Sequence, residues 1–273
     1  PKSLAIEIVA ADGTLIQRFE GKPEAPKKAD GDEGGRGGAP SAAMKAGMNR
    51  FTWNMRHKGF TEFDDMILWA AGNRGVMALP GSYKARLIVD GKAQEQGFTI
   101  AADPRVKVSA ADLKARFDLA QTVTAKVSQA NEAVLLVRGI RAQVDAMGKP
   151  VPAQVPALMA KLSAIEAEIY QVKNRSRQDP LNYPIKLNNK LAALIGIIES
   201  GEAAPTEGTR TVFADLSAQL DRQLQALDAA LAAGLPDANA ALKAAGLKPL
   251  ERKALPASTG SRPGGEEAGG KLW

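Results

Sequence analysis

The spacing of the apolar residues changes once along this chain, next to Asp103-Pro104. Before this point, apolar residues alternate with polar or small ones, a two-residue period that is typical of strands with one buried face. After it, they recur every three or four residues, which is the period of an amphipathic helix. Since one segment cannot satisfy both periods, the sequence predicts an α+β chain of two domains, a β domain over residues 1–102 and a helical domain over residues 103–250.

Two β-hairpins and two further strands are predicted in the β domain. Asp12-Gly13 and Asp90-Gly91 favour tight turns, because both positions of such a turn take positive φ angles. Short strands separated by turn residues are typical of an antiparallel β-sandwich of the immunoglobulin or fibronectin type, and this is the fold that we predict. The six predicted strands cover residues 4–8, 15–19, 51–55, 66–69, 82–89 and 93–100.

Residues 21–48 interrupt the β domain with a mixture of Gly, Pro, Lys, Asp and Ala. Such a segment buries too little apolar surface to offset the entropy lost on ordering, so we expect a mobile loop. The glycines around Arg36 are not followed by the Gly-Lys-Ser/Thr of a phosphate-binding loop. Asp30, Asp32 and Glu33 lack the ligand spacing of an EF-hand, so calcium is not expected either.

Four helical segments are predicted in the second domain, where three or four of them are expected to form an antiparallel bundle. Ser109 and Asp112 have the side chains of a helix N-cap, and the helix that begins there is expected to be about 60 Å long. We interpret the apolar stripes as core; the alternative is an exposed stripe on the first helix that awaits a partner. The stripes cover residues 113–144, 158–172, 187–198 and 213–231, and a short segment, 237–245, follows Gly234 and Pro236.

The chain has no cysteine and a single histidine, His57, which excludes disulfides, thiolate zinc sites, cysteine nucleophiles and multi-histidine metal sites. A lone histidine can act as a general base, but no Gly-x-Ser-x-Gly motif accompanies it. Glu62, Asp64 and Asp65 form the densest group of acids, and glycoside hydrolases use paired carboxylates. Solvated loop acids are the simpler interpretation, so we assign no catalytic, cofactor-binding or metal-binding residue and predict no cofactor.

Aromatic residues offer two further candidate sites. Trp53, Trp69 and Tyr83 are candidates for a ligand platform, although alternating aromatic residues on strands more often belong to a sandwich core. The last segment, 251–273, is rich in Pro, Ser, Gly and charged residues and is predicted to be a tail. Because this tail ends in two apolar residues, we name Leu272 and Trp273 as candidate partner contacts.

Positive charge exceeds negative charge, with 36 Lys and Arg against 30 Asp and Glu. The basic residues are spread along the chain, and their best run, Lys173, Arg175 and Arg177, is short, so nucleic acid is not expected as a partner. No window approaches 18 consecutive apolar residues, and we therefore predict no membrane span. The chain begins with Pro1 rather than Met, from which we expect a processed chain or a part of a longer protein.

Several stretches occur together in the order known from one family. Residues 47–56 (GMNRFTWNMR) and 79–87 (LPGSYKARL) resemble the C-terminal β-sandwich of exported bacterial proteins with sortilin-like, BNR/Asp-box β-propellers, often labelled glycosyl hydrolases. Residues 103–106, 117–120 and 235–242 are similar to the helical region that ends these proteins. The chain departs from the family at Asn54 and His57, where an acid and an aromatic residue are expected, and after residue 250.

The resemblance implies a location in the periplasm, in the cell envelope or outside the cell. No Ser-x-Asp-x-Gly-x-x-Trp Asp-box occurs in the chain, so the propeller is not part of it. We therefore interpret the chain as a non-catalytic structural or interaction module, used for assembly with an upstream propeller of the same polypeptide or for contact with subunits of a complex. One alternative is a part that supports a glycoside hydrolase whose active site lies in the upstream propeller. The second alternative is a separate subunit of a larger envelope complex.

Overall fold

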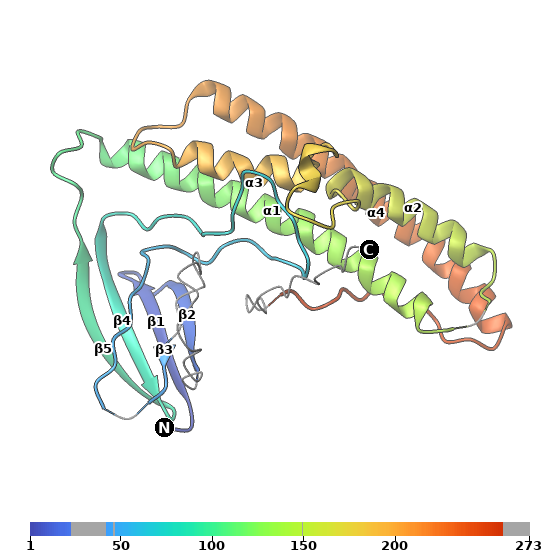
Figure 1. Ribbon diagram of the computed structural model, residues 1–273, viewed down its shortest axis with the longest axis horizontal. Helices are drawn as coiled ribbons and strands as arrows, with labels where there is room; N and C mark the ends of the chain where they lie inside the picture. The colour runs from blue at the N-terminus through green and yellow to red at the C-terminus, as the bar shows by residue number, and fades with distance from the viewer. Residues whose placement is uncertain (23–41, 46, 149, 259–273) are drawn as a thin grey trace, which may run out of the picture.

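The computed structural model describes residues 1–22, 42–45, 47–148 and 150–258. A β-sheet lies at one end of the molecule, next to a long layer of helices (Figure 1). The strands are β1 (Leu4–Ala10), β2 (Leu15–Lys22), β3 (Ala42–Ala43), β4 (Gly81–Val89) and β5 (Lys92–Ile100). The helices are α1 (Ala110–Asp145), α2 (Gln154–Ile169), the short 3₁₀ helix η1 (Asp179–Leu181), α3 (Leu187–Ile198) and α4 (Glu207–Ala244).

The sheet has the strand order β3-β2-β1-β4-β5, in which four strands are antiparallel and the two-residue β3 lies parallel to β2. Both predicted hairpins are confirmed. Asp90 and Gly91 take the positive φ angles of 47° and 80° that a two-residue turn requires. In the first hairpin, Gly13 has a φ of 90° and the Asp12 carboxylate accepts a hydrogen bond from the Thr14 N–H at 2.9 Å.

The predicted β-sandwich is wrong, because the described residues form one sheet. The two faces of this sheet differ in chemistry. On one face, Glu7 pairs with Arg18 of β2 at 2.7 Å and with Arg86 of β4 at 3.0 Å, and Arg86 also pairs with Glu95 of β5 at 2.7 Å. Hydrogen bonds from Arg18 and then Arg86 hold the pKa of the Glu7 carboxyl below its ordinary value. A row of charges across four strands suits water rather than the inner face of a second sheet.

The apolar face of the sheet is covered by extended chain instead of strands. Phe51 packs on Phe19 with ring centroids 4.9 Å apart, and Trp53 packs on Tyr83 at 6.0 Å. Residues 51–55 and 66–69, predicted as strands, form no strand; the segment has only an isolated bridge between Arg56 and Met77. The alternation of residues 51–55 reflects one partly buried side of a coil. We call residues 56–77 the arm, and Figure 1 shows this segment running from the sheet towards the helices.

The four predicted helices are present. Ser109 caps α1 as expected, since its Oγ accepts from the Asp112 N–H at 3.0 Å. In Figure 1, α2 and α3 follow one another between α1 and α4, and both run antiparallel to α1 and α4. None of the described helices combines the length and apolar character that a membrane span requires.

The predicted end of the last helix is wrong. Helix α4 continues through Pro236 to Ala244, so the expected short segment 237–245 is its final part. Proline costs helix stability because it removes an N–H donor. Ala238 and Leu242 beyond it are fully buried, and their burial offsets this cost.

The core of the helical layer includes the arm. Phe60, Phe63, Met66 and Val76 are buried in the same cluster as the inward faces of the helices. A smaller cluster around Ile8, Phe19 and Tyr83 lies under the sheet. The arm therefore contributes its apolar side chains to the core of the helical layer, although the segments before and after it belong to the sheet region.

Candidate functional site

Side-chain amides fasten the arm to the helices. Asn131 of α1 donates to the Thr61 carbonyl at 2.7 Å, and its Oδ1 accepts from the Asn188 amide of α3 at 3.0 Å. Asn189 accepts from the Trp69 N–H at 2.7 Å and donates to the Trp69 carbonyl at 2.8 Å. These bonds satisfy backbone groups of an extended segment that has no neighbouring strand. The buried asparagines therefore have a structural role.

A partly buried ion pair fastens the two ends of the arm. Glu199, at the C-terminal end of α3, accepts from the Arg56 guanidinium at 2.7 Å and from the Met77 N–H at 2.8 Å. Arg56 also donates to the Gly75 carbonyl at 2.7 Å. A carboxylate is unfavourable at a helix C-terminus, so the pairing with Arg56 compensates the local field.

A second charged cluster joins α1 and α2 to the arm. The buried Glu166 of α2 accepts from Arg138 at 2.8 Å and from Arg141 at 2.6 Å. The Arg138 guanidinium also lies 4.6 Å from the ring centroid of Phe63 and 5.3 Å from that of Tyr170. Burial raises the pKa of Tyr170, whose hydroxyl accepts from the Ile67 N–H at 3.1 Å. The cluster therefore has a structural role in joining α1, α2 and the arm.

His57 is half-buried and packs on Phe117 of α1, with ring centroids 4.9 Å apart. Desolvation by burial lowers the pKa of His57, which favours the neutral imidazole. Its backbone N–H donates to the Val76 carbonyl at 2.8 Å. These contacts place the ring in an apolar environment at the junction of the arm and α1.

The predicted acidic group on the arm is not assembled into a carboxylate pair. Asp64 and Asp65 are exposed, and Asp65 has a φ of 61°. Glu62 is partly buried, and its backbone carbonyl accepts from the Ser258 N–H at 2.8 Å. In the described part of the chain, no group of three or more His, Asp or Glu side chains could hold a metal ion.

The three candidate platform aromatics are separated. Trp53 packs with Tyr83 and Phe98 over the sheet, and the Tyr83 and Phe98 rings are stacked at 5.8 Å. Trp69 belongs to the arm and is held by Asn189. Leu272 and Trp273, like Asp30, Asp32 and Glu33, lie outside the described residues.

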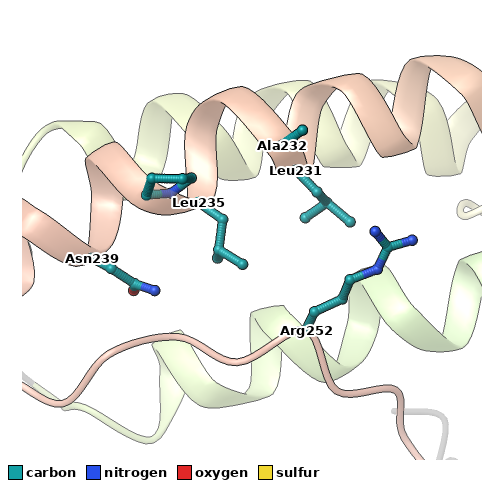
Figure 2. Close-up of a pocket in the computed structure, with 6 residues that line it drawn as sticks. Leu231, Ala232, Leu235, Asn239 and Arg252 are labelled. Carbon is teal, nitrogen blue, oxygen red and sulfur yellow. The ribbon is translucent and has the colours of Figure 1, made fainter.

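One hollow, of about 280 Å³, lies between α4 and the chain that follows it (Figure 2). Its walls are mostly apolar, from Leu231, Leu235 and Pro236. Both polar side chains at this hollow are already engaged. Asn239 bonds to the N–H and carbonyl of Leu250 at 2.7 and 3.0 Å, and Arg252 pairs with Asp228. The two polar side chains of this hollow therefore bind other parts of the chain.

A second hollow, of about 240 Å³, brings together basic side chains that the sequence analysis missed. Lys186 and Lys190 come from the start of α3, and Arg222 comes from the middle of α4. Lys186 and Lys190 stand four residues apart, a spacing that predicts a shared helix face. Nothing local in the sequence indicates that Arg222 joins them, because it is more than thirty residues away.

Comparisons with models of protein families, with curated proteins and with solved structures found no match to this chain.

Proposed function

We propose that this chain is a non-catalytic structural and interaction module, the C-terminal part of an exported propeller protein, used for assembly or partner contact. The observation that carries the interaction role is strand β5. Within the described residues, β5 pairs with β4 alone, over nine residues, and most of its residues are exposed. Its outer edge therefore presents backbone N–H and C=O groups that an extended segment of another protein part can pair with.

The arm supports this role mechanically. Bonds from Asn131, Asn189 and Glu199 attach both ends and the middle of the arm to the helices. The arm is continuous with β4, which carries β5. A strand edge that is held on a rigid support loses less entropy when it pairs with a partner.

The propeller parent is proposed from the sequence resemblance. Residues 79–87, which carry part of that resemblance, lead into and form most of β4. Residues 47–56, which carry another part, form the coil that covers the apolar face of the sheet. One motif therefore forms most of the strand that holds β5, and the other covers the apolar face of the same sheet. We infer that an upstream propeller of the same polypeptide contacts this end of the molecule.

The mass of the native polypeptide tests whether this chain is part of a longer propeller protein. An antibody against this chain would isolate the polypeptide from source cells for intact-mass spectrometry. We expect a mass well above the 28.7 kDa of this chain, by the size of a propeller. A native mass of 28.7 kDa would overturn the propeller parent and favour the separate subunit.

Hydrogen exchange tests whether the outer edge of β5 pairs with another part of the native protein. In the native polypeptide, we expect the amides of residues 93–99 that do not bond to β4 to exchange more slowly than in the isolated chain. The turn amides at Asp12 and Gly13 serve as the internal control, since they lie in the other hairpin. Equal exchange of β5 in both samples contradicts the proposed contact, and glycan hydrolysis by the isolated chain contradicts the non-catalytic role.

A further inference from the structure

The basic hollow lies where three helices meet. Glu168 stands at the end of α2, Lys186 and Lys190 at the start of α3, and Arg222 on the middle of α4. Gln219 and Gln223 of α4, three residues before Arg222 and one after it, also line the hollow and add amide groups to the wall. The hollow is therefore walled by groups that can donate hydrogen bonds from two directions.

Positive charge in this hollow is only partly neutralised. The Lys186 ammonium lies 3.2 Å from the Glu168 carboxylate, which is itself largely exposed. Among the described residues, neither Lys190 nor Arg222 forms an ion pair. Two positive charges are thus left over around a space of about 240 Å³. Like charges that converge without a counter-ion repel one another, so an anion in the hollow would relieve this repulsion.

The backbone adds to the same field. Helix α3 begins at Leu187, which lines the hollow, and its N-cap residue Lys186 makes no side-chain capping bond. The first N–H groups of a helix have no acceptor within it and carry partial positive charge. The side chains of Asn188 and Asn189 point to other partners, Asn131 and Trp69, so they do not satisfy these groups.

We propose that this hollow binds a phosphate-type oxyanion, and that the ligand is a small soluble molecule that carries this phosphate group. Three features carry the proposal: a hollow of about 240 Å³, three cations from two helices, and only one acid among them. Arg222 offers a planar fork of donors that matches two oxygens of a phosphate, while Lys186 and Lys190 supply point charges. The helix end is an additional contribution. The inference does not depend on the propeller parent or on the use of β5.

Binding of inorganic phosphate and of pyrophosphate to the intact chain would be measured by isothermal titration calorimetry. We expect saturable binding that weakens with added salt, because the attraction is between exposed charges. Lys190→Gln and Arg222→Gln should each weaken binding by about 10-fold, which corresponds to the loss of one charge-assisted hydrogen bond. Glu168→Gln should tighten binding, because it removes the only acid among the charged residues that line the hollow.

Arg210→Gln is the matched control. Arg210 is exposed on the same helix, twelve residues before Arg222, which places it about 18 Å away along the axis. This variant removes the same charge and should leave phosphate affinity nearly unchanged. If Arg210→Gln weakens binding as much as Arg222→Gln does, the effect is that of net charge and the site is overturned. Circular dichroism on each variant checks that the helices are intact.

A membrane headgroup carries the same phosphate chemistry, and a vesicle experiment separates the two sources. Vesicles of phosphatidylglycerol would be sedimented with the wild-type chain and with Arg222→Gln. We expect free phosphate to bind and the vesicles to show no dependence on Arg222. Vesicle binding that requires Arg222, together with no binding of phosphate or pyrophosphate, would overturn the small-molecule ligand.

Discussion

Asn188 of α3 donates a hydrogen bond to the side-chain oxygen of Asn131 of α1 at 3.0 Å, and the exposed fractions of these two side chains are 1% and 0%. The bond joins residues that are 57 positions apart in the chain. Asn131 uses its amide group on the Thr61 carbonyl, so the pair connects two helices and the arm. Removal of either asparagine side chain leaves the other one without this hydrogen bond.

Asn131→Ala is expected to destabilise the protein by about 1–3 kcal/mol, the cost of leaving buried polar partners without hydrogen bonds. The affected partners are the Thr61 carbonyl and the Asn188 amide. Urea unfolding followed by circular dichroism measures the change. Gln129→Ala, at an exposed position on the same helix, is the control and should change the free energy of unfolding by less than about 0.5 kcal/mol. Equal effects of the two variants would contradict the role given to Asn131.

Glu166→Gln should cost about 1.5–3 kcal/mol, because it removes the negative charge that two arginines share. Glu168→Gln is its neighbour control, since the Glu168 carboxylate is exposed and its pair with Lys186 contributes about 0–1 kcal/mol. Chemical denaturation of both variants gives the comparison. A cost for Glu166→Gln no larger than that for Glu168→Gln would show that the arginine cluster contributes little.

Gly139→Ala is expected to displace the chain after α4 from α1. A Cβ at residue 139 would lie 2.1 Å from the Lys253 carbonyl oxygen, so one of the two backbones must move. The hydrogen bond from the Leu255 N–H to the Leu135 carbonyl, 3.1 Å, should break. We expect a loss of about 1–3 kcal/mol from overpacking, and faster hydrogen exchange at residues 253–258.

Gly196→Ala is the matched control for that substitution. Gly196 also lies inside a helix, α3, but nothing lies within 4 Å of a Cβ built there. Alanine should therefore stabilise the protein by up to about 1 kcal/mol through helix propensity alone. If both alanine variants stabilise the protein, the close contact at Gly139 does not restrain the chain after α4.

The free energy of unfolding should depend on pH through His57. Burial lowers its pKa in the folded state, so the unfolded state binds more protons around the ordinary value of about 6.5. This contribution to stability is fully present above about pH 6.5 and is lost as the pH falls through the folded-state pKa. Proton NMR reads the pKa directly, because His57 is the single histidine.

His57→Gln tests the same linkage by removing the titrating group. Between pH 7.5 and pH 5.5, the free energy of unfolding should fall less in this variant than in the wild-type chain. Urea titrations at both pH values supply the measurement. An NMR pKa at or above the ordinary histidine value would contradict the desolvation of the ring.

The local elements were predictable because their signals are local. Asp12-Gly13 and Asp90-Gly91 specify turns through the φ angles they tolerate, and Ser109 supplies a cap within its own helix turn. The end of α4 was not predictable in this way. Pro236 disfavours a helix locally, and only the burial of Ala238 and Leu242 among other helices keeps the helix continuous.

The charged residues of the strands argue against a second packed sheet, which the alternation of apolar residues alone does not do. Glu7, Arg86 and Glu95 fall on the side opposite to Ile8 and Tyr83, because successive side chains alternate across a strand. Once the strands are aligned, these charges pair with one another and leave no apolar second face for another sheet. The alignment across β1, β4 and β5 involves partners that are far apart in the chain.

By itself, the sequence determined the period of each segment, and with it the strands of the two hairpins and the four helices. Periodicity reports that one side of a segment is buried but does not report what buries it. The tertiary structure decided that the alternating residues of 51–55 cover a sheet as coil, and that the arm satisfies its backbone with Asn131 and Asn189. It also decided that Lys190 and Arg222 meet at one hollow. Such contacts depend on how helices pack, and packing is set by the whole core.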